Sequence, residues 1–300
     1  MDLKQMTYFI TIVKYHSFSK AARALHISQP SLSNSIQNLE RELGTPLLER
    51  TTRNLQLTEV GKLLYERANK MLQEMNILQE EIQDIIDGDR VEIIIGMIES
   101  ANRWFARLMY EHKQTYPHND FTLIDTLYSK TVLEALLRYE VHAVVTNQEI
   151  IDETIEAVPL YTEKFVVVLP NNHPLMLREN IDLQDLCNVP LILGMPSFQT
   201  CSQIMRAFEH IDLKPQIEFQ IERFEMAKIL VENGAGITIL PENYVKDALP
   251  STLSYRYINN DLLQRTVYFC YVKNRHFPSA ILSFFLLIKN NFKTTRVQIS

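Results

Sequence analysis

Cysteine is scarce in this sequence and follows no recognisable spacing. The 300 residues include only Cys187, Cys201 and Cys270, none of them in a C-x-x-C arrangement. An odd number of scattered thiols argues against both a disulfide framework and a zinc site. We therefore expect three reduced thiols and no bound metal.

Long hydrophobic runs are also missing. The best candidate, residues 280–288, is far shorter than the roughly 20 apolar residues that a membrane-spanning helix needs. The first residues lack a basic region, a continuous apolar core and a small-residue cleavage site, and Leu3, Met6 and Phe9 follow a helical period instead. These absences predict a cytoplasmic protein that begins with a helix and has no membrane partner.

Catalytic signatures are absent as well. The sequence has no nucleophile elbow, no P-loop and no G-x-G-x-x-G after an expected strand, because Gly234-Ala235-Gly236 follows an expected helix. His112 and His118 have no metal-ligand spacing with other donors. We therefore expect no catalytic residue, no cofactor and no enzymatic activity.

Charge is unevenly distributed along the chain. The net charge of −6 taken alone argues against a nucleic-acid-binding protein. Residues 1–58, however, contain seven Lys or Arg and four acids, a balance of +3, whereas the rest of the chain carries 23 basic and 32 acidic residues, a balance of −9. A basic module on an acidic body is expected when only one end meets phosphate. Because an excess of only +3 predicts weak binding of one copy to DNA, we expect two copies to bind together.

Residues 17–43 pair a short alanine-rich helix with a second helix that opens at Ser28. The Ser28 hydroxyl is a natural N-cap, and Pro30 lies where its missing N–H costs nothing. Apolar residues recur every three or four positions along the second helix and define its core face: Leu32, Ile36, Leu39 and Leu43. This pattern predicts a helix-turn-helix.

The opposite face of the second helix is polar and mostly uncharged. Ser, Asn and Gln side chains suit base edges and phosphates in a major groove, whereas an ordinary exposed helix carries interspersed Glu and Lys. Two arginines lie on a short hairpin expected over 47–57, where they would hold phosphate unless they are merely solvated. The predicted DNA-binding residues are Ser28, Gln29, Pro30, Ser31, Ser33, Asn34, Gln37, Arg50 and Arg53.

A long helix is expected after the hairpin. Thr58 caps it, and between residues 59 and 87 the early Gly61 is the only glycine or proline. Apolar residues alternate at steps of four and three along this helix, which is a heptad seam that needs a partner helix. The predicted dimerisation residues are Leu64, Met71, Met75, Leu78 and Ile82. A homodimer would bind a two-fold-related DNA site, the alternative being that the seam packs on the chain's own C-terminal domain.

The pattern changes after Gly88-Asp89-Arg90. Apolar runs now alternate with amphipathic segments, as in a parallel sheet covered by helices on both faces. Strands are expected at 91–97, 121–125, 142–146, 165–170, 190–194, 217–221, 236–240 and 267–272. Helices are expected at 101–115, 130–139, from about 200, at 223–233 and after Pro278. Two α/β lobes are therefore predicted.

Residues 18–64 resemble the DNA-binding domain of LysR-type transcriptional regulators. The resemblance rests on Ala21-Ala22, Leu25, Ser28-Gln29-Pro30, Ser33, Ile36, Leu39-Glu40, Leu43-Gly44, Leu47, Arg50, Leu57-Thr58 and Gly61. It extends more weakly along nearly the whole chain. The sequence departs from the family at Asn34, where Arg or another long residue is common, at Leu48, where Phe is common, and at 139–142, where a Gly-x-x-Asp turn is usual.

The resemblance implies a fold for the whole chain. It comprises an all-α winged helix-turn-helix DNA-binding domain over 1–58, a linker and dimerisation helix over 59–88, and an α/β, two-lobed, periplasmic-binding-protein-like effector domain over 89–300. Lobe I is expected at about 91–163 and 268–300, and lobe II at about 164–267. The chain would thus return to complete the first lobe.

Three junctions between an expected strand and an expected helix carry hydroxyl groups. Open α/β sheets bind ligands at the carboxyl ends of strands, beside helix N-termini that attract anions. In the resembled family the matching positions line the effector cleft, and the segment around Phe224 closes it. The predicted effector-binding residues are Ser100, Ala101, Asn102, Ser129, Ser197, Phe198, Gln199, Thr200 and Phe224. The alternative is that these hydroxyls only cap helices.

Two single residues suggest narrower hypotheses. His142 replaces the acid of the family's usual turn and could tune an anion site, although a satisfied core histidine is the commoner case. Cys201, near an expected helix start, resembles the sensing cysteine of the family's peroxide-responsive branch. No resolving cysteine lies close by, since Cys187 is fourteen residues back, and this favours a buried thiol without a redox role.

Together these observations predict a sequence-specific transcriptional regulator of the LysR type. Its expected partners are double-stranded DNA, a small anionic effector such as a carboxylate, and its own copies in a homodimer or homotetramer, with RNA polymerase a further candidate. An effector that prefers one lobe closure would shift how paired N-terminal domains sit on DNA. The alternative is a cytoplasmic small-molecule-binding α/β protein or enzyme with an incidental helical N-terminal module.

Overall fold

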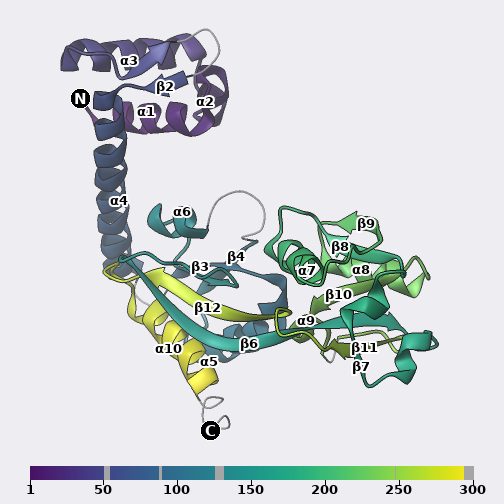
Figure 1. The fold of residues 1–300 in the computed structure, drawn as a ribbon. Helices are drawn as coiled ribbons and strands as arrows, with labels where there is room; N and C mark the ends of the chain where they lie inside the picture. Colours follow the sequence, from purple (N-terminus) through teal and green to yellow (C-terminus); the bar gives the residue numbers. More distant parts are fainter. Residues whose placement is uncertain (51–54, 88–89, 126–131, 247, 294–300) are drawn as a thin grey trace. The chain divides into compact units, whose positions relative to one another are not determined.

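The computed structural model of the chain describes residues 1–50, 55–87, 90–125, 132–246 and 248–293. The chain folds as two units, Met1–Asp87 and Gly88–Ser300. Figure 1 shows a helical head continued by one long helix in the first unit, and a sheet covered by helices in the second. Among the described residues, no helix combines the length and the apolar character that crossing a membrane requires.

Three short helices, a two-stranded wing and a long helix form the N-terminal unit. Their bounds are α1 Leu3–Tyr15, α2 Phe18–Ala24, α3 Gln29–Leu43, β1 Leu48–Arg50, β2 Leu55–Leu57 and α4 Glu59–Asp87. Strands β1 and β2 pair antiparallel, with Leu48 opposite Leu57. The shared core contains Phe9, Ile12, Ala21, Ala22, Leu32, Ile36, Leu39 and Leu47. The predicted helix-turn-helix and hairpin are therefore confirmed.

Local hydrogen bonds set the ends of these helices. The Ser31 N–H donates to Ser28 Oγ at 3.3 Å, as expected of an N-cap, and the Gly61 N–H donates to Thr58 Oγ1 at 3.0 Å at the start of α4. Helix α3 ends at Gly44, whose φ of 71° is the left-handed conformation that glycine adopts without strain. One expectation is wrong: Leu43 is 37% exposed, because it is the last residue of α3 and lies beyond the packed core.

A mixed sheet runs through the C-terminal unit. The main path has the order β4-β3-β5-β12-β6-β10-β8-β9, while β11 pairs with β6 and β7 with β11. The strand bounds are β3 Glu92–Met97, β4 Asp120–Asp125, β5 Ala143–Thr146, β6 Ile155–Pro170, β7 Asn180–Ile181, β8 Leu191–Gly194, β9 Ile217–Ile221, β10 Ile237–Pro241, β11 Leu253–Ile258 and β12 Gln264–Val272. Strands β3, β4 and β5 are parallel and define lobe I; β8, β9 and β10 are parallel and define lobe II.

Two long strands connect the lobes. The first part of β6 pairs antiparallel with β12, and its second part pairs antiparallel with β10 and β11. The parallel sheet predicted from the sequence is therefore confirmed within each lobe and is wrong at β6, β11 and β12, because β6 pairs antiparallel with β10, β11 and β12, and β12 also pairs antiparallel with β5. The apolar run at 165–170 marks only the end of β6, because residues 155–164 mix buried and exposed positions and Pro159 interrupts their apolar residues. The same mixture explains why β11 was not predicted.

Helices cover both faces of each lobe. In lobe I, α5 (Asn102–Thr115) and α10 (Ser279–Lys293) share one core with the sheet, and α6 (Val132–Leu137) packs on the other face. In lobe II, α7 (Gln199–Glu209) and α8 (Phe224–Glu232) belong to two separate cores. Figure 1 shows β12 and α10 returning to lobe I, as the two-lobed fold predicts. Single turns η1 (Glu99–Ala101), η2 (Pro174–Leu177), η3 (Leu183–Leu186) and α9 (Glu242–Val245) complete the unit.

Candidate functional site

The polar face of α3 is open to solvent at the start of the helix. Gln29, Pro30, Ser31 and Asn34 are exposed, and Ser33 and Gln37 are half-buried. The apolar face of α3 packs instead against the core of the N-terminal unit. Hydroxyl and amide groups on this face are therefore accessible to an external partner, and their contact with DNA stays a prediction.

Two of the predicted DNA-binding residues also hold the motif together. Ser28 caps α3, and Ser19 Oγ donates to Gln29 Oε1 at 3.2 Å, which ties α2 to α3. Arg50 ends β1, but its side chain lies outside the described residues, as does all of Arg53. The phosphate-binding role of both arginines stays a prediction.

The apolar seam of α4 has two parts. Near its start, Ala68 is fully buried and Leu64 packs against the core of its own unit. Further along the helix four large side chains are exposed: Met71 51%, Met75 38%, Leu78 50% and Ile82 47%. A run of half-exposed apolar side chains at heptad spacing matches a surface that a second helix covers.

The structure brings two predicted effector residues together in the C-terminal unit. Ser100 lies in η1, directly after β3 of lobe I, and Thr200 lies in the first turn of α7 in lobe II. Arg265 of β12 joins them, because its Nη2 donates to Ser100 Oγ and its Nη1 to Thr200 Oγ1, each at 3.0 Å. The hydroxyl groups from the two lobes therefore meet on one guanidinium group.

Glu163 completes this cluster, which we call the interlobe network (Ser100, Glu163, Thr200 and Arg265). Glu163 Oε1 accepts from Arg265 Nε at 2.8 Å and from Ser100 Oγ at 3.0 Å. Glu163 and Arg265 are register partners on β6 and β12, and Arg265 also lies over the Phe165 ring. All four residues are buried. The hydroxyls of Ser100 and Thr200 thus bind the charged pair, whereas the N-cap positions of η1 and α7 are Ile98 and Phe198.

The other predicted effector residues lie outside this network. Ala101 is in the lobe I core, and Asn102 is exposed at the start of α5. Ser197 and Gln199 are exposed, whereas Phe198 and Phe224 are largely buried in lobe II. Ser129 lies outside the described residues. Their role in effector binding stays a prediction.

A second group of contacts also joins the lobes. Arg223, just before α8, pairs with Asp125 at the end of β4 and lies 3.9 Å from Glu99. Glu99 Oε2 accepts from the backbone N–H of Phe224 at 3.2 Å. Burial raises the pKa of Glu99, and the Phe224 hydrogen bond and the Arg223 charge oppose that rise. The two lobes are therefore joined by the ion pairs of Arg223 as well as by the interlobe network.

Hydroxyl groups at strand ends do not point to Glu163, Arg265 or Arg223. A usable signal is present around the start of β12, where Leu263, just before the strand, Arg265 and Val267 are buried at alternate positions, so that the arginine takes an inward position among apolar residues. A charged residue at such a position needs a buried partner. The identity of that partner depends on strand pairing, which the local pattern does not specify.

The two residues singled out individually are both buried. His142 is buried, and its Nδ1 accepts from the Ile94 N–H at 2.9 Å; burial and the nearby Arg275 charge lower its pKa to about 3. Burial raises the pKa of the Cys201 thiol, which is the opposite of what a reactive thiolate needs. Within the described part of the chain, no group of three metal-ligating side chains comes together.

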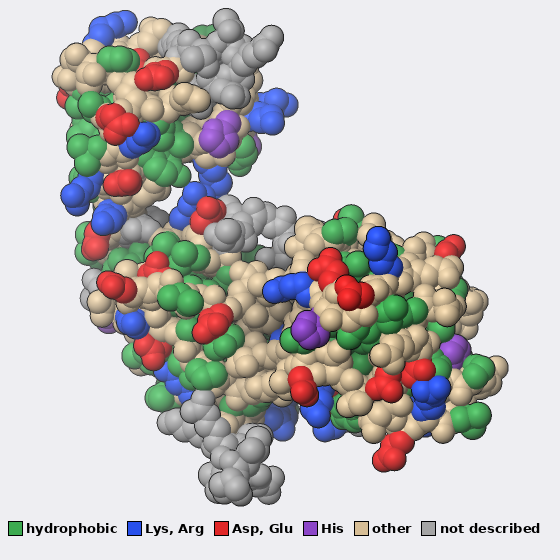
Figure 2. All heavy atoms as spheres, viewed as in Figure 1, with side chains coloured by type: hydrophobic (Ala, Val, Ile, Leu, Met, Phe, Trp, Pro, Cys, Tyr) green, Lys and Arg blue, Asp and Glu red, His purple; other side chains and the backbone are tan. Residues whose placement is uncertain are grey.

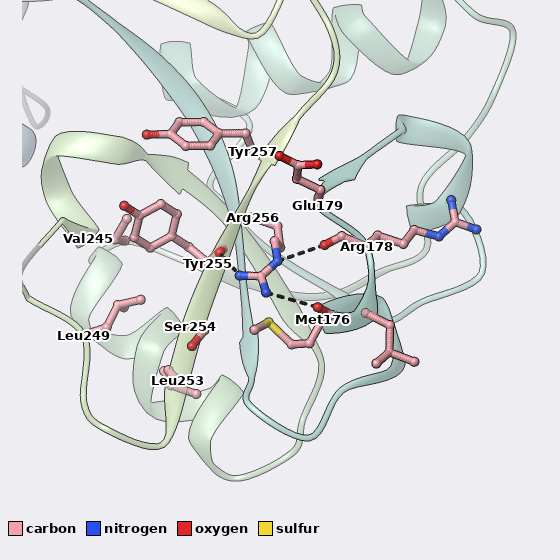
Figure 3. A pocket seen from close by; sticks show the side chains of 11 residues that line it. Met176, Arg178, Glu179, Val245, Leu249, Leu253, Ser254, Tyr255, Arg256 and Tyr257 are labelled. Carbon is pink, nitrogen blue, oxygen red and sulfur yellow. Dashed lines mark hydrogen bonds between the residues drawn. The ribbon is translucent and has the colours of Figure 1, made fainter.

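Figure 3 shows a separate cavity in lobe II. It has a volume of about 730 Å³ and lies between η2, β11 and the segment that follows α9. Arg256 Nη2 and Nε donate to the carbonyl groups of Met176 and Arg178 at 3.1 and 2.9 Å, so the guanidinium fastens the η2 segment to β11. No residue predicted from the sequence lines this cavity. It is therefore distinct from the interlobe network.

Comparison with known proteins gives two family matches. The model described as bacterial regulatory helix-turn-helix protein, lysR family, matches residues 3–62. The model described as LysR substrate binding domain matches residues 87–293. Together they account for both units of the chain.

Individual relatives match over most of their length. The chain is 29% identical over 276 residues to the uncharacterized HTH-type transcriptional regulator YybE of Bacillus subtilis, covering 92% of this chain and 94% of YybE. It is 31% identical over 248 residues to the HTH-type transcriptional regulator BenM of Acinetobacter baylyi, 80% of each protein. The crystal structure of full-length BenM matches at a TM-score of 0.57 and 27% identity over 98% of both chains. Full-length CbnR in complex with its target DNA matches at a TM-score of 0.55 and 23% identity, covering 97% of this chain and 99% of CbnR.

Proposed function

The chain belongs to the LysR family of transcriptional regulators, and from this we propose that it binds operator DNA through α3 and the wing and responds to a small carboxylate held between its lobes. Both family models describe parts of a regulator, so the alternative of an enzyme with an incidental helical module is not retained. The DNA-binding residues, the oligomer and the effector class are the parts proposed.

The DNA-binding part of the proposal is supported by the exposed polar start of α3. Such a helix places its first residues against base edges in the major groove, while arginines of the wing neutralise phosphates beside it. CbnR, a structural relative, has been crystallised on its target DNA. Pairing along the exposed seam of α4 would present two such helices to a two-fold-related site, as a dimer or as a pair of dimers.

Selection from a random duplex library by the full-length protein tests this part. The expected product is a motif with two related half-sites, bound far more tightly than shuffled DNA of the same composition. Recovery of unrelated sequences that bind as weakly as the shuffled control would contradict it.

The observation that carries the effector site is the convergence of Ser100 and Thr200, one from each lobe, on Arg265. A ligand that contacts this network touches both lobes and the strands that join them. Its binding free energy can therefore favour one lobe arrangement over another, and this preference would alter how the paired DNA-binding units and RNA polymerase meet at a promoter. Charge elsewhere gives little guidance, since Figure 2 shows both signs interspersed with hydrophobic side chains on the visible face of the C-terminal unit.

A ligand-shift melting screen of small carboxylates on the full-length protein tests the effector site. A ligand at one hundred times its Kd is expected to stabilise the folded state by roughly 3 kcal/mol. The same compound should change the affinity for the selected operator. A compound that stabilises the protein without any change at the operator would not be the effector proposed.

A further inference from the structure

One oxygen of a buried carboxylate has no partner in the interlobe network. Glu163 is 0% exposed; its Oε1 accepts two hydrogen bonds, but Oε2 has none from any described residue. A buried acceptor without a donor is unfavourable by about the free energy of a lost hydrogen bond. A ligand that supplies a donor at this oxygen would therefore gain affinity from it.

The same network has unused donors. Arg265 donates three hydrogen bonds within the network, one from each of its nitrogens. Two of its five guanidinium N–H groups are therefore not used within the network. Thr200 Oγ1 accepts from Arg265, and no acceptor for its own hydrogen is recorded among the described residues. Thr200 also lies in the first turn of the eleven-residue α7, whose start has no side-chain cap. These donors suit the oxygens of a carboxylate.

The charge balance between the lobes disfavours a simple anion. Glu163 and Arg265 neutralise one another, and the second interlobe contact sets Glu99 and Asp125 against Arg223. Adding a bare anion beside the buried and already neutral Glu163–Arg265 pair leaves one buried charge uncompensated, which is electrostatically costly, whereas a zwitterion adds no net charge.

We propose that the effector is a carboxylate with its own hydrogen-bond donor beside the carboxyl group, as in an α-amino acid, the donor binding Glu163 and the carboxylate binding Arg265, Thr200 and the start of α7. This rests on the proposed effector site between the lobes. Arg265 contacts both Glu163 and Thr200, so the two ligand groups must be neighbours. An ammonium group suits Glu163 better than a hydroxyl group, because it also balances the charge.

Burial of the network links this recognition to lobe movement. Ser100 and Thr200 are 2% and 6% exposed, so the ligand reaches Glu163 only when the lobes part. When the lobes close again, the ligand would lie between Glu163 on β6 and Thr200 on α7. The distance between its donor and its carboxylate, rather than the direct hydrogen bonds of Arg265, would then set the spacing of the lobes.

Calorimetric titration of the full-length wild-type protein with matched acids tests the proposal. The probes are sets that differ only beside the carboxyl group: propionate, lactate and alanine; succinate, malate and aspartate; glutarate, 2-hydroxyglutarate and glutamate; 3-phenylpropionate, phenyllactate and phenylalanine. In the set whose side chain fits, the amino acid should bind at least about tenfold more tightly than the unsubstituted acid, with the hydroxy acid between them. Equal binding by the unsubstituted acid overturns the proposal and leaves the carboxylate site intact.

A variant locates the discrimination. Glu163→Gln removes the charge and should reduce the preference for the amino acid to about twofold, while Glu156→Gln, the same change elsewhere on β6, should leave it unaltered. Undiminished preference in folded Glu163→Gln overturns the role of Glu163. If Glu163→Gln does not fold, the wild-type comparison decides alone. Failure of every probe here and of every carboxylate in the wider screen would overturn the proposed effector site together with this inference.

Discussion

At the scale of single residues, the C-terminal unit depends on a charged pair placed where a strand would usually carry apolar side chains. Glu163 and Arg265 are 0% and 7% exposed. Removing both charges from water costs several kcal/mol for each, and their mutual attraction offsets this only because Ser100 and Thr200 supply further hydrogen bonds. The pair is therefore sensitive to the loss of either partner.

Arg265→Ala should destabilise the C-terminal unit strongly, because it leaves the Glu163 carboxylate buried without its cation. We expect a loss of roughly 3–5 kcal/mol in the free energy of unfolding, measured by urea denaturation. Arg178→Ala is the matched control, because Arg178 is 53% exposed and pairs with Asp185 near the surface, where an ion pair contributes about 1 kcal/mol or less. Equal losses in the two variants would refute the importance assigned to burial.

His142 should make stability depend on pH. Burial lowers its pKa from 6.5 to about 3, so between these values the unfolded chain binds the proton and the folded chain does not. The contribution of neutral His142 to the free energy of unfolding is complete above pH 6.5 and is lost as pH falls from 6.5 towards 3. Between pH 7.5 and 5 we expect His142 to account for a decrease of about 2 kcal/mol in the free energy of unfolding.

His142→Asn tests this dependence, because the amide oxygen can still accept from the Ile94 N–H. The decrease from pH 7.5 to pH 5 should be smaller in this variant by about 2 kcal/mol than in wild type. His118→Asn at an exposed position should retain the wild-type decrease. Parallel pH profiles for wild type and His142→Asn would show that the histidine titrates normally in the folded state.

At the scale of elements, the helix α3 and the wing have separate tasks. The exposed start of α3 carries uncharged donors and acceptors that suit base edges, whereas the wing carries arginines that suit phosphates. Loss of a base contact changes preference among sequences, and loss of a phosphate contact weakens binding to all of them.

Asn34→Ala and Arg53→Ala should therefore differ in kind. Asn34→Ala is expected to cost roughly 1–3 kcal/mol on the selected operator and little on random duplex. Arg53→Ala should weaken binding about equally on both and flatten the dependence of affinity on salt. Fluorescence anisotropy at several salt concentrations measures both effects. A change confined to sequence preference in Arg53→Ala would reverse the assigned roles.

Within one chain, the apolar seam of α4 stays largely exposed to solvent. Met75 and Leu78 are 38% and 50% exposed on its seam. Met75→Glu combined with Leu78→Lys should place charges in the proposed dimer interface and yield monomers that bind DNA weakly. Light scattering measures the mass, and Gln79→Glu, a charge added at an exposed neighbouring position, should leave the oligomer intact. A dimer in the double variant would move the interface elsewhere.

At the scale of the whole molecule, sensing and DNA binding belong to different units of the chain. Ser100 and Thr200 lie in Gly88–Ser300, whereas α3 lies in Met1–Asp87. A defect in the interlobe network should therefore impair the response to effector and spare unliganded DNA binding. Coupling between the sites would be reciprocal, so operator DNA should change effector affinity by the same factor.

Ser100→Ala and Thr200→Ala test this separation. Each variant should lose about 1–2 kcal/mol of effector binding, because Thr200→Ala removes a hydroxyl contact to the ligand and Ser100→Ala removes the hydroxyl that positions Glu163 and Arg265, while promoter occupancy without effector stays near that of wild type. Calorimetry measures the first quantity and footprinting the second, with thermal melting as the check on folding. A normal response from both variants would confine their hydroxyls to a structural role.

The sequence by itself determined the elements of this protein and much of its class. Periodicity located α3, the wing, the long α4 and most strands of the two lobes, because a helix or strand with one buried face repeats its apolar residues at a fixed spacing. The caps at Ser28 and Thr58 were predictable for a similar reason, since they depend on residues three positions away. Hydroxyl groups at strand ends likewise predicted that Ser100 and Thr200 lie near one another, and their role in effector binding stays a prediction.

Only the tertiary structure decided what those hydroxyls contact. Arg265 lies 165 positions from Ser100 and 102 from Glu163, and these residues meet because β6 and β12 pair antiparallel between the lobes. No local spacing encodes that pairing, which results from burying many apolar side chains at once. The same holds for the exposure of the α4 seam and the burial of His142. Local patterns set which residues share a face, and the packing of distant faces sets which charges meet.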